Sequence, residues 1–143
     1  EGFIFYTNYN SEKGLAIAEN PKICISFFWS NLERQIIIKG TAEKLAKNLS
    51  DGYFESRPDG SKLGALVSDQ SSVIESRTVL ESKLVQLEKE YRGKEIERPN
   101  HWGGYLVRPV SIEFWQGRPN RLHDRIRYTL TDDFDWKMER LAP

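Results

Sequence analysis

The stretch SIEFWQGRPNRLHDRIRYTL, residues 111–130, places two runs rich in β-branched and aromatic residues on either side of a tight Gly-Arg-Pro-Asn turn. Such runs are typical of β-strands, here 111–117 and 125–130, while Gly, Pro and Asn are typical of turns. Strands with turn-like joins recur along the chain. They predict an antiparallel barrel or sandwich with added helices, an α+β fold.

The turn in this stretch also concentrates charge and aromatic surface. Within twelve residues it gathers three arginines together with Trp115 and His123. Guanidinium groups suit phosphate and carboxylate oxygens, Trp offers a flat apolar surface, and His exchanges protons near neutral pH. Two interpretations are open: a loop that holds a planar anionic ligand, or a solvated basic turn.

The same reasoning extends to the rest of the chain. Further strands are predicted at 3–8, 22–29, 34 to about 45, 103–109 and 134–141. Helices are predicted at 12–19, 46–56, 61–67 and 75–91. Ser11 is the expected N-cap of the first helix. Ser72 with Glu75 matches a capping box just ahead of the last helix, although the true cap could also lie a few residues on. That last helix carries one apolar stripe, formed by Leu80, Leu84, Leu87 and Tyr91.

Composition limits the classes of function. The 143 residues (16.6 kDa) fit one domain, and 21 basic residues balance 21 acidic ones, which argues against bulk binding to nucleic acid or an anionic membrane. Cys24 is the single cysteine, which favours a reducing, cytoplasmic compartment, and with two histidines it disfavours a metal site. The chain enters a core-like strand almost at Glu1, so we expect that upstream sequence is missing.

Three further segments are suited to anions or ring systems. Tyr53, Arg57 and Ser61 recur every four residues, which predicts a phosphate site on one helix face or else a surface helix end. The amides of residues 68–72 either serve an anion or cap the following helix. The Gln35 amide either hydrogen-bonds to the edge of a ligand's ring system or faces solvent.

Taken in order, eight stretches across the chain resemble the pyridoxine/pyridoxamine 5′-phosphate oxidase family. They are residues 5–8 (FYTN), 32–35 (LERQ), 53–58 (YFESRP), 67–72 (VSDQSS), 102–104 (WGG), 114–117 (FWQG), 121–125 (RLHDR) and 139–143 (ERLAP). No single motif is decisive, but the ordered set is specific.

The resemblance implies one FMN-binding split β-barrel domain of Greek-key type over 1–143, with a dimerisation region at about 102–143. It implies a homodimer with FMN at the subunit interface. It also implies oxidation of pyridoxamine or pyridoxine 5′-phosphate to pyridoxal 5′-phosphate in vitamin B6 metabolism, with O2 giving H2O2 and ammonia leaving from the amine substrate.

Carried over by position, the resemblance implies roles for particular residues. The implied FMN contacts are Tyr6, Thr7, Lys13, Gln35, Gln70, Ser71, Trp115 and Arg125. The implied clamp on the substrate phosphate is Tyr53, Arg57 and Ser61. Arg121 and His123 are the implied catalytic pair at the substrate ring, and Arg121 is expected to position charge because its guanidinium stays protonated.

Two departures accompany the resemblance. Glu12 stands where the family usually has a basic residue, and the family's N-terminal region, with barrel strands and an Arg…Lys segment, has no counterpart in this sequence. Two alternatives to the oxidase therefore stay open. One is a module that binds flavin or pyridoxal 5′-phosphate without turnover, and the other is a dimerising fragment without a ligand.

Overall fold

The computed structural model describes residues 2–143, which form two compact units. The sheet unit comprises Asn20–Ala42 and Val107–Pro143 together with the start of the chain up to Phe3. The helical unit comprises Ile4–Glu19 and Glu43–Leu106. All of the α-helices belong to the helical unit, and their presence beside an antiparallel sheet confirms the α+β class.

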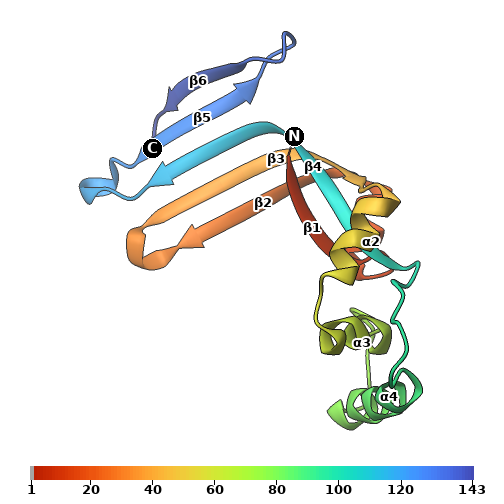
Figure 1. The fold of residues 1–143 in the computed structure, drawn as a ribbon. Helices are drawn as coiled ribbons and strands as arrows, with labels where there is room; N and C mark the ends of the chain where they lie inside the picture. The colour runs from red at the N-terminus through yellow and green to blue at the C-terminus, as the bar shows by residue number, and fades with distance from the viewer. Residues whose placement is uncertain (1) are drawn as a thin grey trace. The chain divides into compact units, whose positions relative to one another are not determined.

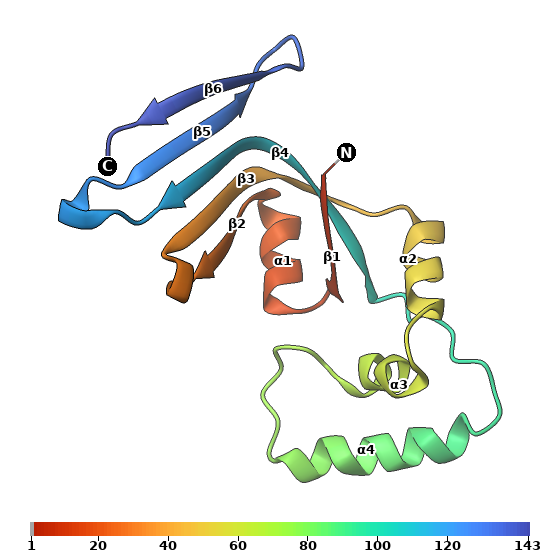
Figure 2. The same ribbon diagram turned by 60° about the vertical axis from the view of Figure 1, so that its left-hand side comes forward.

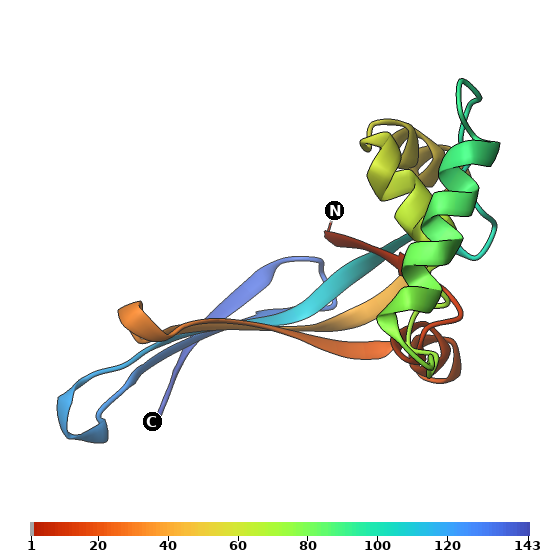
Figure 3. The same cartoon turned by 90° about the horizontal axis from the view of Figure 1, so that it is seen from below.

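The sheet unit is built from strands in the order β2-β3-β4-β5-β6 (Figure 1). Their bounds are β2 Lys22–Trp29, β3 Arg34–Lys44, β4 Trp102–Gln116, β5 Asp124–Leu130 and β6 Trp136–Leu141. The strands β2 and β3, β4 and β5, and β5 and β6 pair antiparallel. Figure 3 views these strands nearly edge-on and shows them as one thin, curved layer.

The opening stretch forms the β4–β5 hairpin, as its pattern predicts. Pairing runs from Ser111 opposite Thr129 to Gln116 opposite Asp124. The 3-10 turn η2 (Pro119–Arg121) lies in the loop between these strands. Asn120 and Arg121 adopt positive φ values of 58° and 61°, a region that costs most residues free energy. The arginine-rich turn therefore has a defined backbone shape at the end of a paired hairpin.

The two strands predicted at 103–109 and 111–117 are a single strand, β4, so the predicted break is wrong. Proline fixes φ at a value that extended chain accepts, so Pro109 does not end the strand. What changes near Pro109 is the partner, since β4 pairs with β1 and its register with β5 starts at Ser111. Gly40 allows a close approach there, because a Cβ on it would lie 2.3 Å from the Arg108 carbonyl oxygen.

The helical unit joins the β1 strand to four helices, of which α3 and α4 pack side by side (Figure 2). The bounds are β1 Phe3–Asn8, α1 Glu12–Glu19, α2 Lys47–Glu55, α3 Asp59–Val67 and α4 Arg77–Glu90. Ser11 caps α1 as predicted, because its Oγ accepts a hydrogen bond from the Gly14 N–H at 3.3 Å.

The last helix begins a few residues after the Ser72–Glu75 match, which is the second of the two positions that the sequence left open. The N-cap of α4 is Ser76, which makes no side-chain cap hydrogen bond, so Ser72 and Glu75 precede the helix. Ser71 adopts φ 74°, which turns the chain just before this non-helical segment. The predicted apolar stripe is largely confirmed, since Leu84, Leu87 and Tyr91 pack against the core.

The core of the helical unit is a cluster of Phe54, Leu63, Ile96 and Trp102. Phe54 is 1% exposed and its ring meets the Trp102 ring edge to face at 5.3 Å. Arg57 lies beside this cluster, in the turn between α2 and α3, because Phe54 precedes it by three residues and both side chains contact the Trp102 ring. Core packing and the candidate site are therefore built from the same turn of chain.

Phe54→Ala is expected to lower the free energy of unfolding by about 3–5 kcal/mol, because it removes a fully buried ring and leaves a cavity. Leu49→Ala on the same helix is the control, since Leu49 is 52% exposed and its loss is expected to cost about 0.5–1 kcal/mol. Urea denaturation of both variants measures the difference. Equal losses in the two variants would contradict the assignment of Phe54 to the core.

No helix in residues 2–143 is both long enough and apolar enough to cross a membrane.

Candidate functional site

A cavity of about 300 Å³ in the helical unit collects polar groups from β1, α3 and the segment after it. It brings together two residues predicted for substrate phosphate, Arg57 and Ser61, with Gln70, predicted for FMN. The full lining is Asn8, Arg57, Ser61, Gly64, Ala65, Ser68, Gln70 and Trp102. Pro58, the N-cap of α3, leads the chain from Arg57 into this helix, so the placement of Ser61 follows from the local sequence.

Arg57 is held in this cavity by aromatic rings. Its guanidinium carbon lies 4.6 Å from the centroid of the Trp102 ring and 5.8 Å from that of Phe54. Its Nη1 atom is buried and has no hydrogen-bond partner within residues 2–143. A buried donor without a partner costs about 1–3 kcal/mol, so this side chain is suited to an incoming anion.

Three aromatic rings are stacked beside the cavity. The ring centroids of Tyr6 and Tyr53 are 3.7 Å apart with planes 11° apart, and Trp102 lies parallel to both at 5.6 Å and 6.3 Å. Burial raises the pKa of the Tyr6 hydroxyl, and the neighbouring Tyr53 raises it further. Tyr6 is thus kept as a protonated hydrogen-bond donor at neutral pH.

A second polar cluster joins three residues predicted for FMN. Gln70 Oε1 accepts hydrogen bonds from Thr7 Oγ1 and the Asn8 N–H, both at 3.1 Å. Lys13 Nζ donates to Thr7 Oγ1 at 3.3 Å. Ser71, also predicted for FMN, follows Gln70 with its backbone in the left-handed region. Lys13 thus brings an ammonium group, a donor that fits a phosphate, next to this cluster, whereas the Thr7 hydroxyl proton is already donated to Gln70.

Glu12, the residue that departs from the resembled family, is exposed beside Lys13. An exposed carboxylate is screened by water and salt, so its repulsion on an anion near Lys13 is weakened.

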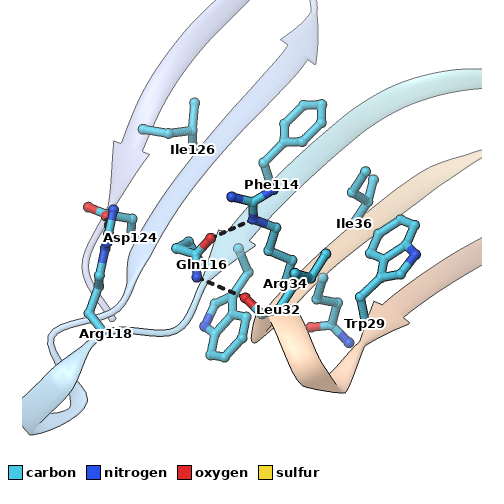
Figure 4. Close-up of a pocket in the computed structure, with 11 residues that line it drawn as sticks. Trp29, Leu32, Arg34, Ile36, Phe114, Gln116, Arg118, Asp124 and Ile126 are labelled. Carbon is cyan, nitrogen blue, oxygen red and sulfur yellow. Dashed lines mark hydrogen bonds and ion pairs between the residues drawn. The ribbon is translucent and has the colours of Figure 1, made fainter.

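The sheet unit contains a larger cavity of about 520 Å³ (Figure 4). Its floor is mostly apolar, and two residues predicted for FMN, Gln35 and Trp115, line it. The other lining residues are Trp29, Leu32, Arg34, Ile36, Phe114, Gln116, Arg118, Asp124 and Ile126. An apolar hollow with a few polar side chains suits a planar ring system.

Arg34 and Gln116 were not predicted as site residues, yet they link β3 to β4 across this cavity. Arg34 Nε donates to Gln116 Oε1 at 2.7 Å, and Gln116 Nε2 donates to the Leu32 carbonyl at 3.1 Å (Figure 4). Both residues occur in stretches that carry the family resemblance, which was the available signal. Gln35 donates to Ser26 Oγ at 3.3 Å on the neighbouring strand.

Arg125, predicted to contact FMN, is already bound on two sides. Its Nε and Nη2 donate to the Glu113 carboxylate at 2.8 Å and 3.2 Å, and its Nη1 donates to the Ala142 carbonyl at 3.1 Å. The hydrogen bond to Glu113 raises the pKa of Arg125 above its ordinary value. Three of the five guanidinium N–H groups are therefore used within the protein, which fixes the direction in which the others point.

His123 and Arg121, predicted for the substrate ring, lie in the loop after β4. The Arg118 backbone N–H donates to His123 Nδ1 at 3.1 Å, so the neutral imidazole carries its proton on Nε2. The His123 ring lies 5.0 Å from that of Trp115. Arg121 is exposed and has no ion pair within residues 2–143, which leaves its charge available to a ligand.

Asp124 anchors the same loop. Its carboxylate accepts from Arg118 Nε at 2.8 Å and from Arg140 Nη1 at 2.7 Å. These two hydrogen bonds hold the pKa of Asp124 below its ordinary value of 3.8. A lowered pKa in the folded state means that the pairs stabilise the fold above the ordinary pKa, and that this contribution is lost as the pH falls through the lowered value.

Asp124→Asn is therefore expected to lower the thermal midpoint at about pH 6, and this deficit is expected to shrink as the pH falls below the ordinary value of 3.8 and through the lowered pKa, because the wild-type carboxylate then becomes protonated as well. Thermal unfolding of both proteins across this range measures the difference. Asp132→Asn in the β5–β6 turn is the control, because Asp132 is exposed and forms no ion pair among the described residues. A deficit that stays constant with pH would contradict the ionic role.

The predicted site residues fall into two groups by unit. The helical unit holds Tyr6, Thr7, Lys13, Tyr53, Arg57, Ser61, Gln70 and Ser71, and the sheet unit holds Gln35, Trp115, Arg121, His123 and Arg125. Within the first group, the cavity and the stack bring the cofactor and substrate residues together. Within the second, Gln35 and Trp115 share a cavity and Trp115 contacts His123.

Comparisons with known proteins agree on one family. A family profile described as pyridoxamine 5′-phosphate oxidase matches residues 1–90, and one described as pyridoxine 5′-phosphate oxidase C-terminal dimerisation region matches residues 102–143. The chain is 73% identical to the pyridoxine/pyridoxamine 5′-phosphate oxidase of Flavobacterium psychrophilum and 68% identical to that of Flavobacterium johnsoniae. The two alignments cover 100% and 99% of this chain, but 67% and 66% of the two relatives. This chain therefore spans about two thirds of their length.

Two solved structures share the fold. PhzG from Burkholderia lata 383, in complex with tetrahydrophenazine-1-carboxylic acid, matches with a TM-score of 0.89 at 31% identity, over 99% of this chain and 69% of that one. A pyridoxamine 5′-phosphate oxidase-related, FMN binding protein from Nostoc punctiforme matches with a TM-score of 0.73 at 17% identity, over 98% of this chain and 71% of that one. These matches confirm the predicted split-barrel fold class.

Proposed function

The chain belongs to the pyridoxine/pyridoxamine 5′-phosphate oxidase family, and on that premise we propose that it oxidises pyridoxamine or pyridoxine 5′-phosphate to pyridoxal 5′-phosphate with FMN as cofactor. The observation that carries the proposal is the arrangement around Arg57. A buried guanidinium nitrogen without a partner opens onto a cavity shared with Ser61 and Gln70. A phosphate ester supplies the acceptor oxygens that this nitrogen lacks.

The residues of the helical unit fit the phosphate of FMN as well. Lys13 and the backbone around Ser71 would hold it, because they offer a positive charge and N–H donors, and Thr7 would orient Lys13 by accepting a hydrogen bond from it. In the sheet unit, Gln35 and Trp115 would meet the ring system, since they line an apolar hollow. Arg125 would contribute through the N–H groups that Glu113 and Ala142 leave unused.

When bound, FMN would supply the redox chemistry, the two-electron oxidation of the substrate carbon coupled to reduction of O2 to H2O2. The protein residues bind and orient the substrate. Arg57, Tyr53 and Ser61 hold its phosphate, which fixes one end of the molecule. Arg121 places a permanent positive charge at the ring, and it cannot act as a base because its guanidinium stays protonated.

His123 has a defined role in this scheme. Because Nδ1 accepts from the Arg118 N–H, Nε2 presents a proton to an acceptor on the substrate. The neighbouring Trp115 ring limits the orientations open to the imidazole. Nε2 is therefore the imidazole nitrogen that would donate a hydrogen bond to the substrate.

The assembly is part of the same proposal. A homodimer with FMN at the interface would use the region matched by the dimerisation profile, residues 102–143, and would make the 143 residues one functional FMN-binding domain. A cytoplasmic location is consistent with Cys24, which is an exposed free thiol.

Titration of FMN with the purified chain, followed by quenching of flavin fluorescence, tests the cofactor assignment. Saturation at one FMN per chain supports it, and the absence of saturable binding overturns the oxidase proposal for this chain. Binding without peroxide formation on addition of pyridoxamine 5′-phosphate would instead indicate a non-catalytic flavin module.

A further inference from the structure

Trp102 stands at the point where the core, the phosphate cavity and the aromatic stack meet. It is 8% exposed, belongs to the core cluster and also lines the cavity with Arg57. We infer that Trp102 is a positioning residue for the phosphate clamp, setting the place of Arg57 through a cation–aromatic contact and that of Tyr53 through the aromatic stack. This inference rests on the proposed function, because it assumes that the clamp binds a phosphate ester.

The first step concerns Arg57. Among residues 2–143 no carboxylate pairs with it, and its guanidinium instead lies 4.6 Å from the Trp102 ring centroid. A cation over an aromatic face is attracted without being neutralised, whereas a carboxylate partner would cancel its charge. Trp102 therefore fixes Arg57 and leaves its full charge for the ligand.

The second step concerns Tyr53. Its ring lies parallel to Trp102, with planes 3° apart and centroids 6.3 Å apart, and Tyr6 is stacked against it. Tyr53 is 45% exposed, so few other contacts restrain it. The same indole thus orients two members of the clamp, one by a cation–aromatic contact and one through the stack.

The third step concerns Trp102 itself, whose backbone is held firmly. Arg98 donates one hydrogen bond to the Trp102 carbonyl and another to Asp51 Oδ1 at 2.6 Å, and the Arg98 side chain is 9% exposed. The Trp102 N–H donates to the Pro99 carbonyl at 3.0 Å. A rigidly placed indole can act as a template, since its position does not depend on the ligand.

Calorimetric titration of the flavin-free full chain with pyridoxine 5′-phosphate and with pyridoxine separates the clamp from general packing. In Trp102→Leu the affinity for the phosphate ester is expected to fall about 5- to 30-fold while that for pyridoxine stays within about twofold, and Trp102→Phe is expected to fall between. Trp136→Leu is the control, because Trp136 lies on β6 of the sheet unit and is 37% exposed.

A double variant distinguishes positioning from packing. On an Arg57→Ala background, Trp102→Leu is expected to weaken ester binding further by at most about threefold, because Arg57 is gone and only the positioning of Tyr53 remains to be lost. Equal losses for both ligands, or full additivity with Arg57→Ala, would reduce Trp102 to a core residue and overturn the inference. A wild-type chain that binds the ester no better than pyridoxine would overturn the phosphate clamp itself, and the inference with it.

Discussion

Arg57→Ala is expected to weaken binding of pyridoxamine 5′-phosphate by about 1.5–3 kcal/mol, the usual worth of a hydrogen bond to a charged group. In steady-state kinetics this appears as a KM raised about 10- to 150-fold, with a smaller change in kcat. The reason lies in the cavity: the unpaired Nη1 atom and the aromatic support make Arg57 the strongest candidate donor to the phosphate there.

Two further variants make the Arg57 experiment specific. Arg57→Lys keeps a positive charge but loses the planar fork, so its KM is expected to fall between wild type and Arg57→Ala. Arg92→Ala is the matched control, since Arg92 is exposed beyond the end of α4. An unchanged KM in Arg57→Ala would remove this residue from the clamp, and an equal rise in Arg92→Ala would show that only general charge matters.

Arg121→Ala is expected to lower kcat about 100-fold, a loss typical of removing one preorganised charged group from a reacting centre. The effect is expected mainly in turnover, because the phosphate clamp that sets most of the binding stays intact. Arg121 is suited to this role because it is exposed, bears no ion pair within the described part of the chain, and sits on a loop fixed by Asp124.

The backbone at Arg121 requires its own control. Its φ of 61° disfavours alanine, so loop distortion by itself could lower the rate. Arg121→Asn tolerates that conformation and also lacks the charge, so it is expected to lose as much activity as Arg121→Ala. Arg77→Ala, at an exposed ion pair on α4, is expected to keep the wild-type rate. Near wild-type turnover in Arg121→Asn would contradict the role of the charge.

The sequence predicted most elements well where the signal was local. The strands at 3–8 and 22–29 and the helix at 12–19 have the predicted bounds, because β-branched runs and the Ser11 cap act over a few neighbours. The break in β4 was predicted wrongly because the change of partner near Pro109 depends on pairing between distant segments. The start of the last helix was left open between Ser72 and a position a few residues on, because several serines precede it and spacing alone does not choose among them; the structure places the cap at Ser76.

The candidate site was predicted residue by residue only through the family resemblance. Residue chemistry alone did not decide whether the segments Tyr53–Ser61 and Ser68–Ser72 form a ligand site or are ordinary helix ends. Trp102 was not predicted as a site residue, because its contact with Arg57 joins segments that are distant in the sequence and is visible only in three dimensions. The pairing of Arg125 with Glu113 is likewise a cross-strand contact, set by the β4–β5 register.

The most direct test of the account is to supply the purified chain with FMN and pyridoxamine 5′-phosphate in air and to measure pyridoxal 5′-phosphate and H2O2 together. The account expects both products to form in equal amounts, to require FMN, and to be far slower with unphosphorylated pyridoxamine. Saturable FMN binding without either product would contradict the oxidase function of these 143 residues.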